Sequence, residues 1–140
     1  MPSVFTRIID GELPARFVWS DDRCVAFLTH RPLRPGHTLV VPRLEVDHWV
    51  ELEPELFRHL MGVSHRIGQA LQHGFHPLRV GMIIAGLEVP HAHVHLVPFH
   101  TMEQLNFSQA DQDPRPDDLD RAAQTIRRSL TELGFATGVV

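Results

Sequence analysis

Three histidines alternate with apolar residues in the segment His91-Ala92-His93-Val94-His95. If this segment is a β-strand, the three imidazoles share one face and Ala92 and Val94 share the other, because side chains alternate across a strand. Neighbouring imidazoles of the row then lie about 7 Å apart along the backbone. A neutral imidazole can act as a nucleophile, as an acid or base, or as a metal ligand. The row is therefore the first candidate for chemistry in this chain.

Three interpretations of the row are open. It could be the solvated polar face of a half-exposed strand. It could hold a metal ion, since His91 and His93 at i and i+2 can share one ion, although the outer pair, about 13 Å apart, cannot easily join one tetrahedral site. It could also perform phosphoryl chemistry, in which one histidine attacks phosphorus while its neighbours orient it and neutralise charge.

The elements that must position this row are predicted from apolar spacing and from chain breakers. In order, we expect a helix over residues 5–11, strands over 17–20, 23–28 and 37–41, a long helix from Pro54 to His73-Gly74, strands over 78–85 and 92–97, an exposed acidic excursion over 103–120, and a helix over 119–133. Five strands with hairpin-like spacing and two main helices predict an α+β fold with an antiparallel sheet. The length of 140 residues predicts one domain over residues 1–140.

The composition excludes several classes of protein. No apolar run reaches the roughly 18 residues that a membrane span needs, and the first ten residues lack the pattern of a secretory signal. The single cysteine, Cys24, cannot form an internal disulfide, which favours the cytoplasm. A net charge of −4, with 13 scattered arginines and no lysine, makes duplex nucleic acid or a membrane surface a poor partner.

Residues 91–97, with the pattern His-φ-His-φ-His-φ-φ, resemble the signature motif of the histidine triad (HIT) family. Four further segments are similar to the family: the opening segment 5–14, the hairpin 21–28, the Pro-Gly-His strand within 32–42, and the loop from Ala85-Gly86 to His91. The resemblance covers residues 3–98 in register, and the tail after about residue 100 lies outside it. It implies a HIT-like α+β fold that forms homodimers by joining two sheets.

The resemblance also implies an activity. Members of the family hydrolyse or transfer at the α-phosphate of a nucleotide, without a cofactor. His93, the middle histidine, would attack phosphorus and form a covalent nucleotidyl-histidine. His91 and His95 would hydrogen-bond the phosphate and leaving group and set the tautomer of His93, and His37 would lie near the phosphate. His95 favours the hydrolase and nucleotide-binding branches, because the hexose-phosphate transferase branch tends to have Gln there.

The resemblance assigns the base and ribose pocket to a set of mostly apolar positions: Phe5, Ile8, Leu13, Phe27, Leu28 and, at the ribose, Thr29. Simple core packing is an equal alternative for the apolar ones. Before the triad, Leu87 and Glu88 replace the usual Gln and Ser/Thr, and a carboxylate at Glu88 would repel phosphate if it pointed inward. The positions of a structural zinc site in bacterial members are Ser3, Thr6 and Glu45 here, so we expect no metal.

These inferences converge on a cytoplasmic homodimer that hydrolyses a nucleoside phosphoramidate, a dinucleoside polyphosphate or a nucleotidyl ester, with AMP derivatives as the model ligands. Two alternatives remain: a nucleotide-binding module with little catalysis, and a metal-dependent enzyme that uses the histidine-rich strand.

Overall fold

Five strands form one antiparallel sheet in the order β1-β2-β3-β5-β4. The computed structural model describes residues 1–140. The strands are β1 (Phe17–Ser20), β2 (Cys24–Leu28), β3 (Thr38–Pro42), β4 (Arg79–Ile83) and β5 (Val94–Phe99). The predicted α+β fold with an antiparallel sheet is confirmed.

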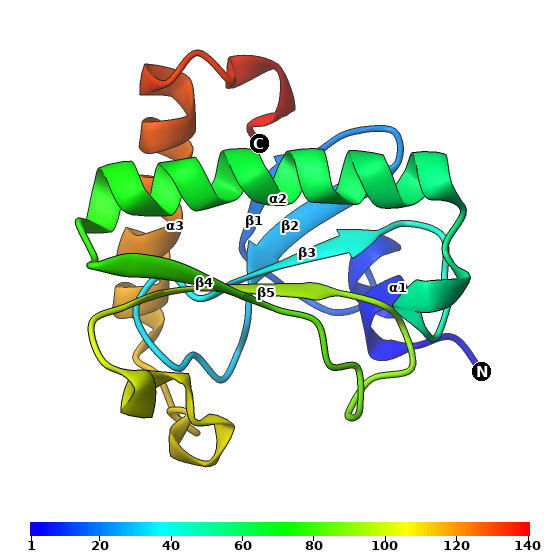
Figure 1. Cartoon of the computed structure of the whole chain (residues 1–140), viewed down its shortest axis with the longest axis horizontal. Coiled ribbons are helices and arrows are strands. Elements are labelled where there is room, and N and C mark those ends of the chain that lie inside the picture. The colour runs from blue at the N-terminus through cyan, green and yellow to red at the C-terminus, as the bar shows by residue number, and fades with distance from the viewer.

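Three helices accompany the sheet: α1 (Val4–Ile9), α2 (Pro54–Phe75) and α3 (Pro116–Glu132). In α2 the buried side chains recur at helical spacing (Leu60, Val63, Ile67, Leu71), so the helix lies along the sheet on one stripe (Figure 1). Short 3-10 turns at Met102–Leu105 and Phe107–Gln109 fill part of the predicted excursion. No helix has the combination of length and hydropathy that crossing a membrane requires.

The strand register divides the side chains between two faces of the sheet. Trp19, Ala26, Val40 and Val94 pair across the strands on the face that packs against α2 and α3. The opposite face carries a second row, Phe17, Phe27, Leu39 and His95, and Phe5 of α1 packs on it. The last histidine of the motif therefore faces the α1 side.

The strand that carries the histidines begins later than predicted. The sequence predicts a strand over residues 92–97, but β5 begins at Val94, so His91 and His93 precede it. Its pairing with β3 stops at Val40 opposite Val94. Two residues further along β3, Pro42 has no N–H to donate to a partner strand, and its carbonyl accepts from the imidazole of His91. The prediction that all three histidines belong to the strand is therefore wrong, although Phe5 of α1 packs against both His91 and His93 and His93 packs against His95, so the three imidazoles still lie on the α1 side, while Ala92 and Val94 face the core.

Both main helices extend beyond their predicted bounds. α2 continues past Gly74 to Phe75 and ends at His76, which has a positive φ of 52°. Gly74 is a packing position, because a Cβ there would lie 2.6 Å from Ser129 Oγ and 2.7 Å from Thr125 Cγ2 of α3. α3 starts at Pro116, so the end of the predicted excursion is helical.

Candidate active site

A cavity of about 380 Å³ opens on the α1 side of the sheet. All the residues assigned to a base and ribose pocket line it, together with two of the triad histidines: Phe5, Ile8, Leu13, Phe27, Leu28, Thr29, Glu88, His93 and His95. Its volume and mostly apolar wall are typical of a small-molecule site. The structure thus brings the predicted binding residues to one place, around an apolar slot with imidazoles at its wall.

His93 is held in one tautomer by a backbone carbonyl. Its Nδ1 lies 2.7 Å from the carbonyl oxygen of His91, which can only accept, so Nδ1 carries the proton and donates. In the neutral ring, Nε2 then keeps its lone pair. The ring is 5% exposed and packs edge-on against Phe5 and His95, each with a centroid distance of 4.8 Å. His93 is thus a fixed imidazole with an unprotonated nitrogen.

His95 and His37 form a directed chain of hydrogen bonds. The backbone N–H of Leu33 donates to Nδ1 of His37 (3.0 Å), so the proton of neutral His37 is on Nε2. That Nε2–H donates to Nδ1 of His95 (3.0 Å), which places the proton of His95 on its Nε2. His37 is buried behind His95 and is absent from the cavity wall. The chain leaves His95 as a hydrogen-bond donor beside His93.

His91 is not part of the cavity wall and lies behind Phe5, at a ring centroid distance of 5.9 Å. Its ring is fully buried; Nε2–H donates to the carbonyl oxygen of Pro42, and Nδ1 accepts from the hydroxyl of Ser3, both at 2.7 Å. Both ring nitrogens thus have protein partners, so a hydrogen bond from the His91 side chain to phosphate would require one of these partners to be replaced. The carbonyl of His91, rather than its imidazole, sets the tautomer of His93.

Ser3 fastens α1 to the triad segment. Its Oγ caps the helix by accepting from the N–H of Thr6 (3.0 Å) while it donates to His91. The carboxylate of Glu45 accepts from the N–H of Ser3 (2.7 Å) and the hydroxyl of Thr6 (2.6 Å). Ser3, Thr6 and Glu45, at the positions of the zinc site in other members, are thus linked by hydrogen bonds beside His91.

Substituting Ser3→Ala should lower the free energy of unfolding by about 2 kcal/mol, because it removes a helix cap and leaves a buried acceptor on His91 without its donor. Denaturant unfolding measures the change. Ser3→Thr is the matched control, since it keeps the hydroxyl and should retain most of the stability. Equal stability of the alanine variant and the wild type would contradict this assignment of the Ser3 hydroxyl.

The four histidines are neutral near pH 7. Burial lowers the pKa of His37 to about 3, with a further contribution from His95, and burial lowers that of His95 to about 4. Burial also lowers the pKa values of His91 and His93. The lone pair on His93 Nε2 is therefore available across the neutral pH range.

Several residues at the cavity are not predicted from the sequence. Leu39 lines the wall because the register places it opposite His95, and Leu119 and Arg16 come from α3 and from the chain before β1. The guanidinium of Arg16 is paired with Asp120 at 2.6 Å. Phe107, in a 3-10 turn after β5, packs against His95 at a centroid distance of 4.9 Å. The strand alternation could have indicated Leu39, but the others depend on how the tail folds back.

The model of the HIT domain family matches residues 10–102, which include all four histidines described above. The chain belongs to the HIT family. An uncharacterised HIT-like protein of Methanocaldococcus jannaschii is 35% identical over 99 residues, which are 68% of this chain and 77% of that protein. The crystal structure of a zinc-bound histidine triad family protein from Mycobacterium smegmatis is 28% identical, with a TM-score of 0.80 over 93% of this chain and 94% of that one.

A third HIT relative has a named activity. The adenylylsulfatase HINT3 of Arabidopsis thaliana is 30% identical over 100 residues, which are 68% of this chain and 51% of that protein.

Proposed function

We propose that this HIT protein is a nucleotidyl hydrolase or transferase that acts at the α-phosphate of a nucleotide through a covalent nucleotidyl-His93. The observation that carries the proposal is the tautomer of His93. Its Nδ1–H is bound to a backbone carbonyl, which leaves the Nε2 lone pair of a ring that lines the cavity. An imidazole held in this way is prepared for nucleophilic attack, because it needs neither deprotonation nor reorientation.

The reaction would proceed in two displacements. In the first, the Nε2 lone pair of His93 forms a bond to phosphorus, and the bond from phosphorus to the leaving group breaks with its electron pair on the leaving group. His95, whose proton is on Nε2, can donate to the departing atom or to the phosphate. In the second, water attacks phosphorus and gives one proton back to Nε2 of His95, the P–N bond breaks with its electron pair on Nε2 of His93, and a nucleoside monophosphate leaves. The sum consumes one water and returns His93 to its starting tautomer.

The nucleoside would occupy the apolar part of the cavity. Phe5 and Phe27 present aromatic surface there, and their ring centroids are 5.6 Å apart. Thr29 lines the same wall, with a hydroxyl that can bond to a sugar. The named activity of HINT3 supports a substrate with an adenylyl group. The lone, buried Cys24 agrees with a location in the cytoplasm, which we include in the proposal.

The charges of the cavity favour an amine as the leaving group. His93 and His95 are neutral near pH 7, and Arg16 is paired with Asp120. Glu88 is therefore the only lining residue with an unpaired charge, and its carboxylate raises the pKa of His93, which burial lowers. A negative field disfavours a polyphosphate leaving group and favours a cationic one. Of the substrates considered, a nucleoside phosphoramidate fits best.

Substituting Glu88→Gln should therefore shift substrate preference. We expect kcat/KM for a dinucleoside polyphosphate to rise about twofold to fivefold relative to that for an adenosine phosphoramidate, a modest change because Glu88 is exposed and screened by salt. Competition assays with both substrates measure the ratio, and raising the ionic strength should shrink the effect. Glu88→Asp keeps the charge and serves as the control. An unchanged ratio would show that the charge of Glu88 does not determine substrate preference.

A panel of nucleotidyl substrates tests the function itself. Release of AMP from a phosphoramidate, polyphosphate or nucleotidyl ester, unaffected by chelator, is the expected result. Binding of AMP without turnover of any substrate would indicate a nucleotide-binding module instead. Loss of turnover with chelator, together with stoichiometric zinc in the purified protein, would indicate the metal-dependent alternative.

We further propose that the protein forms a homodimer through β4. This strand is at the edge of the sheet, so one row of its backbone N–H and C=O groups has no strand partner. Its Met82 side chain is 48% exposed. Two β4 strands pairing antiparallel would join the sheets of two chains. Light scattering should then give the mass of two chains for the wild type and of one chain for Met82→Asp; a monomeric wild type would contradict the proposal.

A further inference from the structure

A second concave site lies on the α2 side of the sheet. It has a volume of about 310 Å³ and shares no residue with the nucleotide cavity. Six of its lining residues come from one face of α2, at helical spacing, and the seventh comes from the turn between β1 and β2: Glu55, Arg58, His59, Gly62, Val63, Arg66 and Arg23. Three guanidinium groups thus face one pocket against a single lining carboxylate.

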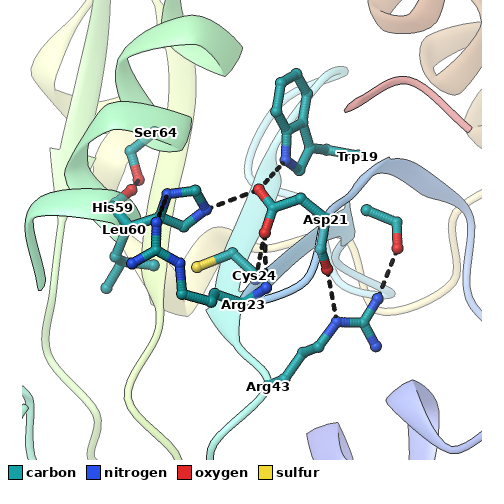
Figure 2. A network of polar contacts seen from close by, with 9 residues as sticks. Trp19, Asp21, Arg23, Cys24, Arg43, His59, Leu60 and Ser64 are labelled. Atoms are coloured by element: carbon teal, nitrogen blue, oxygen red, sulfur yellow. Dashed lines mark hydrogen bonds and ion pairs between the residues drawn. The ribbon is translucent and has the colours of Figure 1, made fainter. Parts of the chain in front are cut away.

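The turn that carries Arg23 is rigidly held by Asp21, as Figure 2 shows. Asp21 Oδ1 accepts from the N–H groups of Arg23 and Cys24, each at 2.8 Å. Its Oδ2 accepts from the indole N–H of Trp19 and from Nε2 of His59, again at 2.8 Å. These hydrogen bonds lower the pKa of Asp21 to about 2 against the opposing effect of burial, so it is a carboxylate whose oxygens are already occupied. Asp21 therefore does not compete for the arginines.

Arg23 donates to an imidazole instead of a carboxylate. Its Nη2 lies 3.0 Å from Nδ1 of His59, which must accept, so His59 is neutral and donates Nε2–H to Asp21 (Figure 2). A guanidinium has five N–H donors, and one is used in this contact. The contact with His59 thus orients the guanidinium of Arg23, while its charge and its other N–H donors remain available to a ligand.

Arg66 is positioned by aromatic rings. Its Cζ lies 5.7 Å from the ring centroid of Trp19 and 5.3 Å from that of Phe135. Such cation–π contacts hold the plane of the guanidinium without using its N–H groups. Arg58 is paired with Glu55, the one carboxylate of the wall. Gly62, between the arginines, has open space where a Cβ would be, so the middle of the pocket is clear.

We propose that this pocket binds a small anion with more than one phosphate group, of the inorganic pyrophosphate or triphosphate class. Guanidinium forks match phosphate oxygens in bidentate geometry, and two of the three forks are held in place before any ligand arrives. The pocket is a concentration of positive charge in a chain of net charge −4. Its size, at the low end for ligand sites, suits a compact anion rather than a nucleic acid strand.

Pyrophosphate titration followed by backbone amide NMR tests this proposal, because it resolves the two sites. The amides of Arg23, Gly62 and Val63 should shift with one saturable curve, whatever happens at His93 and His95. Arg58→Gln and Arg23→Gln should each weaken binding at these amides about threefold to tenfold. Glu55→Gln should tighten it, since the competing carboxylate is gone.

The variants also distinguish specific binding in this pocket from non-specific electrostatic attraction to the protein surface. Arg128→Gln removes an exposed arginine of α3, paired with Glu132, and should leave the affinity unchanged. Thermal melting of each variant checks that it is folded. Shifts confined to the nucleotide cavity would overturn the proposal, as would equal affinities of Arg58→Gln, Glu55→Gln and the wild type. Equal weakening by Arg128→Gln and Arg58→Gln would also overturn it, by indicating diffuse attraction only.

Discussion

Replacing His93 by alanine should reduce kcat/KM for a nucleotidyl substrate by at least about 10³-fold while AMP still binds. The reduction follows because the substitution removes the attacking atom, and the loss of a covalent nucleophile is among the largest single-residue effects in enzymes. Binding survives because the nucleoside would contact the apolar wall around Phe5 and Phe27, which the substitution leaves intact. Steady-state kinetics and calorimetric titration with AMP measure the two quantities.

His100→Ala is the matched control for this experiment. His100 is exposed and is not part of the cavity wall, so its removal should leave both turnover and AMP affinity unchanged. If His93→Ala kept more than about a tenth of the wild-type activity, His93 could not be the nucleophile. If the variant lost AMP binding together with turnover, the two roles assigned to the cavity would not be separable.

Acid should destabilise the fold already below about pH 6.5, where most carboxylates are still ionised. The pKa of His37 is lowered to about 3 and that of His95 to about 4, from an ordinary 6.5. Between about pH 4 and 6.5 the unfolded chain therefore binds more protons than the native one, so the free energy of unfolding increases with pH in this window and is lost as pH falls. The slope is about 1.4 kcal/mol per pH unit for each imidazole that stays neutral.

Denaturant unfolding at pH 7, 6 and 5 measures this slope. His37→Gln removes one of the two imidazoles and should make the slope shallower, whereas His65→Gln, on the exposed side of α2, should leave it unchanged. The pKa of Asp21 is lowered to about 2, so its contribution disappears only below its ordinary value of 3.8, outside the window. Equal stability at pH 7 and pH 5 would contradict the buried, neutral state of these histidines.

The sequence predicts the strands of the sheet well because their bounds depend on neighbouring residues in the chain. Alternation and breakers place β1, β2 and β3 within a residue of their observed bounds. The same alternation places His91 and His93 on the correct side of the sheet but begins their strand too early, since it assumes a regular strand. β5 begins only at Val94, and before it the Pro42 carbonyl accepts a hydrogen bond from the imidazole of His91 instead of from a backbone N–H. A side chain that replaces a backbone hydrogen bond leaves no periodic signal.

Other features of the site depend on contacts between distant segments. Ser3 and His91 are 88 residues apart, yet their hydrogen bond fixes the orientation of the first triad histidine. Leu119 reaches the cavity only because α3 packs beside β1, and Phe107 meets His95 only because the tail folds back after β5. Gly74 looks like a helix end in sequence, but it is the point where α3 approaches α2. Local patterns cannot predict such meetings, since they depend on the tertiary arrangement.

The central claim is that the lone pair on His93 Nε2 attacks phosphorus. Mass spectrometry of protein mixed with an adenosine phosphoramidate and denatured within the first turnovers tests it most directly, at neutral to alkaline pH because acid cleaves the P–N bond. We expect one added adenylyl group on the peptide that contains His93, and none in His93→Ala. An adduct on another residue, or turnover with no adduct at any time point, would contradict it.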